Sequence, residues 1–69
     1  MKLSARNMLK GTVKAVTPGA INCEVTLDLG NGVEVVAQIT SESAKNLGLA
    51  SGKAAYAVIK ADHVMVAVD

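Results

Sequence analysis

The chain has 69 residues, and its seven Lys and Arg against six Asp and Glu give a formal net charge of +1. This balance argues against a basic surface that binds the phosphate backbone of a nucleic acid, and against a polybasic segment that binds a membrane. A single cysteine excludes an internal disulfide, and with a single histidine it cannot complete a tetrahedral zinc site.

A core built from so short a chain supplies little stability, so small domains add disulfides, a metal or oligomerisation. Oligomerisation is the remaining means here, and the many Ala and Val residues suit close packing of subunits. We expect one domain over residues 1–69.

Lys2 precedes no apolar run that would form a secretory signal, and no stretch approaches membrane-spanning length. The free cysteine suits a reducing compartment, so the cytoplasm is expected.

Three strands are predicted in the first forty residues. Leu9 to Val16 is the first, and it ends at the turn-forming residues Thr17-Pro18-Gly19. Ile21 to Leu29 then alternates apolar and polar residues, as a half-buried strand does. Gly30-Asn31-Gly32 accepts positive φ at low cost, and Val33 to Thr40 alternates again. These two strands are therefore expected to form a hairpin.

The pattern then changes to one short helix and two further strands. Thr40 to Gly48 reads as the helix, with Thr40 or Ser41 as its cap. Strands are expected over Ala54 to Lys60 and over Val64 to Val68, and the last is apolar on both faces, as in a central strand or a subunit interface. The order predicts an all-β fold, a five-stranded OB-like Greek-key barrel with one short helix between strands 3 and 4.

Donor groups for an anion occur near both ends of the chain. Ser4 offers a hydroxyl, Arg6 a fork of charged donors, and the backbone near Arg6 and Asn7 its N–H groups. Lys60 could hold a charge over an anion, and Ala61 leaves its N–H sterically open. In the alternative interpretation, Ser4 and Arg6 are surface residues and Lys60 extends to solvent.

Thr40 and Ser43 bracket the predicted helix start, where unpaired N–H groups favour anions, although ordinary capping is the better explanation of these two residues taken alone. Cys23 is expected to be a small buried apolar residue. His63 stands beside Asp62, but no serine or cysteine is placed to be activated by it. The pattern favours binding over catalysis, so no enzyme is expected.

Five groups of residues carry a resemblance to a known family. They are Ser4-Ala5-Arg6-Asn7 with Leu9-Lys10-Gly11, Ile39-Thr40 with Ser43, Leu47-Gly48-Leu49, Tyr56-Ala57-Val58-Ile59-Lys60-Ala61, and Val64-Met65-Val66. In this order they resemble the molbindins, the small molybdate-binding Mop proteins, from Lys2 to about Val66. The unit is also similar to the molybdate-sensing domain of a bacterial regulator and to an accessory domain of molybdate importers.

The resemblance implies an OB-like barrel that assembles as a hexamer, a trimer of dimers, with molybdate or tungstate bound at subunit interfaces. One class of site would take its first residues from one subunit: Ser4, Ala5, Arg6 and Asn7. A neighbour would complete it with Lys60, Ala61, Thr40 and Ser43. A second class, on the threefold axis, would lie near Gly19, Ala20, Ile21 and Asn22. The implied function is cytoplasmic molybdate storage or homeostasis, without an organic cofactor, a nucleic acid or a membrane.

Three positions depart from the family pattern. Asp62 replaces a small neutral residue and brings a carboxylate toward the expected anion. Pro18 replaces a frequent lysine near the expected axial site, and Met8 replaces a frequent glutamine and is expected to pack.

Two alternatives stay open. A nucleic-acid-binding OB domain normally needs a basic groove and aromatic stacking platforms, whereas this chain has Tyr56 as its sole aromatic residue and a net charge of +1. A ligand-free regulatory or assembly module would form the same oligomer but would not respond to molybdate.

Overall fold

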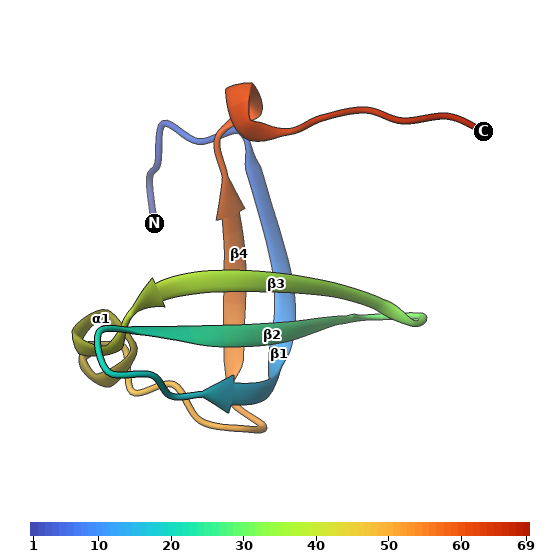
Figure 1. Cartoon of the computed structure of the whole chain (residues 1–69). Coiled ribbons are helices and arrows are strands. Elements are labelled where there is room, and N and C mark those ends of the chain that lie inside the picture. The colour runs from blue at the N-terminus through green and yellow to red at the C-terminus, as the bar shows by residue number, and fades with distance from the viewer.

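A computed structural model describes residues 1–69 as four strands, one short α-helix and one 3-10 turn. Their bounds are β1 Asn7–Thr17, β2 Asn22–Gly30, β3 Val33–Thr40, α1 Ser41–Asn46, β4 Ala54–Ile59 and η1 Ala61–His63. The strands form one sheet in the order β3-β2-β1-β4, and every neighbouring pair is antiparallel. The sheet curls, so that the β2–β3 hairpin crosses the β1–β4 pair (Figure 1). The all-β class and the single short helix are confirmed.

The predicted hairpin of β2 and β3 is confirmed. Its turn places Asn31 at φ 54° and Gly32 at φ 78°, two successive left-handed residues that match the twist of the flanking strands. The alternation along β2 buries Cys23, Val25 and Leu27 and directs the intervening polar residues outward. Cys23 is therefore a buried free thiol, as expected.

Strand β1 belongs to both halves of the sheet. Its residues 7–12 pair with β4 and its residues 12–17 pair with β2. The register with β2 shifts between Val13 and Ala15, which bends the strand where it passes from one half to the other. At Gly11 an added Cβ would lie 2.7 Å from the backbone oxygen of Asp28. Glycine at this position therefore allows β1 and β2 to approach closely.

The helix is shorter than the expected Thr40–Gly48 stretch, and those two residues lie just outside it. Thr40 is the N-cap, and its Oγ1 accepts a hydrogen bond from the Ser43 backbone N–H at 3.0 Å. Gly48 has φ 63° just beyond the helix end. The Lys53 ammonium donates to the carbonyl oxygens of Leu47, at 2.7 Å, and Gly48, at 3.2 Å, which satisfies groups that the helix end leaves unpaired.

The predicted fifth strand over Val64 to Val68 is wrong for the single chain. Residues 64–69 form no strand, and beyond Val64 they make no backbone hydrogen bond. The Val64 N–H donates to the Ala61 carbonyl and closes η1, after which the chain runs away from the sheet (Figure 1). An apolar run becomes a strand only where it pairs, so the sheet has four strands and is not a closed five-stranded barrel.

The core is small for a folded chain. Six of the 69 residues are buried, all of them apolar: Val13, Cys23, Val25, Leu27, Ala44 and Ala57. In contrast, Ile21 is 77% exposed and Met65 is 93% exposed. The single chain therefore leaves much of its apolar surface in water. The structure contains no helix with the length and hydropathy that a membrane crossing requires.

The burial of Val13 generates a stability prediction. Val13→Ala should lower the free energy of unfolding by about 2 kcal/mol, because the side chain is only 1% exposed and its loss leaves a cavity. Urea denaturation followed by circular dichroism measures the change. Val36→Ala removes the same two methyl groups from a side chain that is 59% exposed and should cost less than about 0.5 kcal/mol. Equal losses for the two variants would contradict the central role of Val13.

Candidate anion-binding site

The residues predicted to bind an anion lie in two separate clusters. The strand-start cluster lies where β1 begins and β4 ends: Ser4, Ala5, Arg6, Asn7, Lys60 and Ala61. The helix-start cluster surrounds the first residues of α1: Thr40, Ser43, Gly19, Ala20, Ile21 and Asn22. In Figure 1 the first lies at the top, beside η1, and the second lies at the lower left, beside α1.

Strand pairing assembles the strand-start cluster from the two ends of the chain. Asn7 is the register partner of Ile59, and its Nδ2 donates to the Ile59 carbonyl oxygen at 3.2 Å. This contact holds Asn7 beside Lys60, which follows Ile59 directly and caps η1. The resemblance assigned Lys60 and Ala61 to a neighbouring subunit, whereas the structure places them beside Asn7 of the same chain.

The cations of this cluster are exposed and have no acidic partner. The one ion pair in the structure joins Lys14 and Glu34, and its hydrogen bond raises the pKa of Lys14. Neither Arg6 nor Lys60 forms an ion pair, so both charges remain available to an anion. Asp62 in η1 is also unpaired, so its negative charge is not neutralised near the cluster.

Sequence reasoning overlooked one cation in this region. Lys2 and Arg6 line the same hollow of about 360 Å³, together with Ala5, Leu3 and Met8. The amino acid sequence carries no signal of this proximity, because a spacing of four residues brings side chains together in a helix and residues 1–6 are not helical. The hollow thus has two cationic side chains on an otherwise mainly apolar surface.

In the helix-start cluster, hydrogen bonds tie the loop before β2 to the helix. The Ser41 N–H donates to the Ile21 carbonyl at 2.8 Å, and the Ser41 hydroxyl donates to the Gly19 carbonyl at 3.1 Å. A Cβ at Gly19 would lie 2.3 Å from the backbone oxygen of Asn22, so the loop requires glycine there. The residues expected at an axial site therefore adjoin the start of α1, and Asn22 is the register partner of Thr40.

Two hydroxyl groups in this cluster have different roles. The Thr40 hydroxyl accepts from the Ser43 N–H at 3.0 Å and donates to Ser43 Oγ at 2.7 Å, so it is occupied as a helix cap. This supports the capping interpretation for Thr40. Because Ser43 Oγ accepts that bond, its own hydrogen remains available to donate to an anion.

The two clusters do not meet within one chain. They hold donors of the kind an oxyanion needs, namely hydroxyls, backbone N–H groups and cations. No group of three or more His, Cys, Asp or Glu side chains that could hold a metal ion occurs in the structure. The donor set thus favours an anion over a metal cation.

The amino acid sequence matches the TOBE domain family over residues 3–66. It is 45% identical over 69 residues to a probable molybdenum-pterin-binding protein of Haemophilus influenzae, and the match covers the whole of both chains.

Solved structures agree with this match. A molybdate-binding protein from Sporomusa ovata superimposes with a TM-score of 0.92 and 37% identity, covering 99% of this chain and 100% of that one. The cytoplasmic molybdate-binding protein ModG, solved with molybdate bound, superimposes with a TM-score of 0.85 and 52% identity, covering 88% of this chain and 43% of that one. These matches and the curled sheet described above show that the chain belongs to the TOBE domain family and, within it, to the molbindins.

Proposed function

We propose that this protein binds molybdate reversibly and serves as a cytoplasmic store or buffer of the oxyanion, with no bond made or broken. The observation that carries the proposal is the strand-start cluster, where Arg6 and Lys60 are exposed and unpaired. The relatives that bind molybdate or molybdenum-pterin support the same ligand class. A catalytic role finds no support in the arrangement, because no nucleophile adjoins a base in either cluster.

Selectivity would follow from the chemistry of the donors. A site that directs N–H groups, cations and hydroxyl hydrogens at the anion stabilises a full dianion and offers few acceptors for the proton of monoprotonated phosphate, which disfavours that ion. Sulfate is a smaller tetrahedron and would leave some donors of a molybdate-sized site unpaired. Tungstate has nearly the same size and charge as molybdate and should bind similarly.

Complete sites would form between copies of the chain. We propose that the strand-start cluster of one copy meets the helix-start cluster of another, with Ser43 as the hydroxyl donor of the second. The small core and exposed apolar surface support assembly, and the family resemblance suggests a hexamer built as a trimer of dimers. A second class of site near Gly19, Ala20, Ile21 and Asn22 would form where these loops meet around the threefold axis. Each chain would contribute one domain.

Calorimetry tests the ligand. Titration of the full chain with molybdate should give submicromolar binding, because several charge-assisted hydrogen bonds act on one dianion. Sulfate titrated under the same conditions should bind far more weakly. Absence of heat with molybdate, at protein concentrations well above micromolar and at two temperatures, would contradict the proposed function.

Substitution of Lys60 tests the cationic contribution. Lys60→Ala should weaken molybdate binding by about tenfold or more, because a hydrogen bond to a charged group contributes about 1.5–3 kcal/mol. Lys10→Ala removes the same charge from β1, away from both clusters, and is the matched control. Calorimetry gives the affinity, and native mass spectrometry checks that the oligomer is intact. If the two variants bind molybdate equally, Lys60 is not part of the site.

Mixing two defective variants tests whether sites are shared between copies. Lys60→Ala damages the strand-start cluster, and Ser43→Asp adds a repelling charge to the helix-start cluster while suiting a helix N-terminus. When the two proteins are unfolded and refolded together, some interfaces should join two undamaged clusters and regain tight molybdate binding. A mixture that binds no better than the separate variants would mean that each site lies within one chain.

A further inference from the structure

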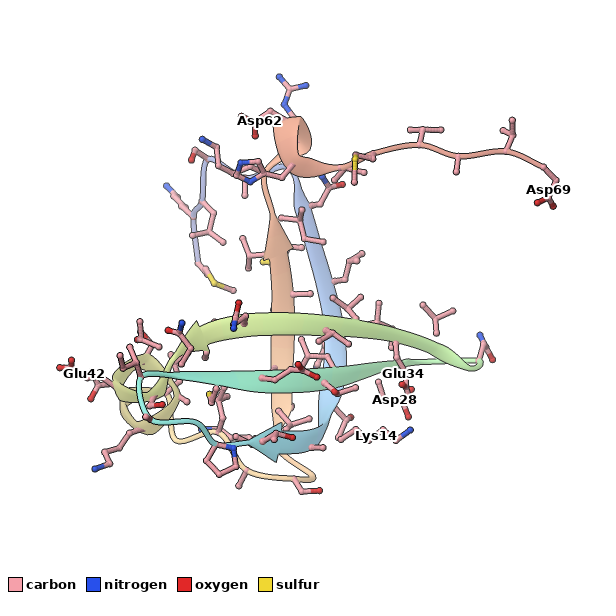
Figure 2. The ribbon with its side chains drawn as sticks, viewed as in Figure 1. Lys14, Asp28, Glu34, Glu42, Asp62 and Asp69 are labelled. Carbon is pink, nitrogen blue, oxygen red and sulfur yellow. The ribbon has the colours of Figure 1, made fainter.

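One carboxylate lies in the region of the strand-start cluster. Asp62 directly follows Ala61, and both belong to η1, which begins just after β4 ends. Residues 1–11 and 54–63, which include the paired parts of β1 and β4, contain no other acidic residue. Figure 2 shows Asp62 at η1, well apart from Asp28 near the hairpin turn. The cations of the cluster therefore share their surroundings with a single negative side chain.

The charge of Asp62 is not neutralised within the chain. The only ion pair joins Lys14 and Glu34, and no side-chain hydrogen bond involves Asp62. The neighbouring His63 donates through its backbone N–H to the Lys60 carbonyl at 3.0 Å, and its imidazole makes no contact with the carboxylate. Asp62 is also exposed. A full negative charge is therefore free to act on an anion nearby.

Covalent geometry keeps this charge close to the anion donors. Because Asp62 is bonded to Ala61, its carboxylate lies within about 9 Å of the Ala61 amide nitrogen in any rotamer. The Debye length is about 10 Å at 0.1 M salt and about 30 Å at 0.01 M. An anion that accepts from the Ala61 N–H therefore lies within range of the Asp62 charge, and salt screens the interaction only in part.

We propose that Asp62 sets the charge selectivity of the anion site, by weakening the binding of a tetrahedral dianion more than that of a tetrahedral monoanion. This inference rests on the proposed function, since it takes Lys60 and Ala61 as donors to the anion. The Coulomb repulsion is proportional to the charge of the ligand, so its free-energy cost is twice as large for a dianion as for a monoanion of the same shape. Asp62 thus makes molybdate easier to release than the cations alone would.

Two oxyanions of equal shape and unequal charge test the proposal. Perrhenate is tetrahedral, as molybdate is, but carries one negative charge. At about 0.01 M salt, Asp62→Ala should raise the molybdate affinity about fourfold and the perrhenate affinity about twofold, as expected for charges about 8 Å apart in water. Calorimetry gives the molybdate affinity, and displacement of bound molybdate gives that of perrhenate. Equal factors for the two ions, or no change in either, would overturn the proposal.

Two matched variants separate the local charge from other effects. Asp62→Glu keeps the charge and should keep both affinities of the unmodified chain. Asp28→Asn removes one charge near the hairpin turn but retains an oxygen for the Gly30 N–H, which Asp28 accepts at 2.8 Å, and should leave both affinities unchanged. A gain in Asp28→Asn equal to that in Asp62→Ala would assign the effect to the overall charge of the protein and overturn the proposal.

Ionic strength gives a second measurement that needs molybdate alone. The gain in molybdate affinity of Asp62→Ala over the unmodified chain should disappear at about 1 M salt, where the Debye length is about 3 Å. A gain that persists there reflects a change of structure and would overturn the charge role. If neither protein binds molybdate at any salt concentration, the proposed function fails together with this inference. If both bind it with equal affinity, only the inference fails.

Discussion

The fold depends on one constraint, the contacts that β1 makes on both of its sides at Val13, with β2 and with the turn before β4. The Val13 backbone N–H donates to the Lys53 carbonyl and its carbonyl accepts from the Gly52 N–H, each at 2.8 Å. On the other side Val13 is the register partner of Leu27, and its side chain is the most buried in the molecule. The two halves of the sheet therefore meet at this residue, next to the register shift that bends β1.

Because the curled sheet encloses so few side chains, a single chain has only marginal stability by itself. Burial of apolar area is the main favourable term in folding, and only six residues are removed from water here. The polar groups that would bind an oxyanion are exposed in the same chain, at two separate places. Assembly would therefore meet two needs at once, since the contacts that cover apolar surface also bring donors from different copies together.

Local features of this structure were predictable from the amino acid sequence because local physics determines them. The alternation along β2, the left-handed turn at Asn31 and the Thr40 cap each depend on residues close in the chain. The secondary structure of residues 64–68 was not predictable in this way. An apolar run indicates that a strand can form, but it does not indicate which strand it would pair with. The proximity of Lys60 to Asn7 depends on pairing across 52 residues, and it became apparent only from the register of β1 and β4.

The length of β1 has a geometric consequence for the two clusters. The strand-start cluster precedes and includes its first residue, Asn7, and the loop of the helix-start cluster begins two residues after its last, Thr17. The first and last of eleven residues in a strand lie about 33 Å apart at about 3.3 Å per residue, less the shortening that the bend imposes. Because β1 is hydrogen-bonded along its length, it holds the two clusters at a fixed separation. Where copies of this chain join the two clusters, β1 would therefore set the distance between successive sites.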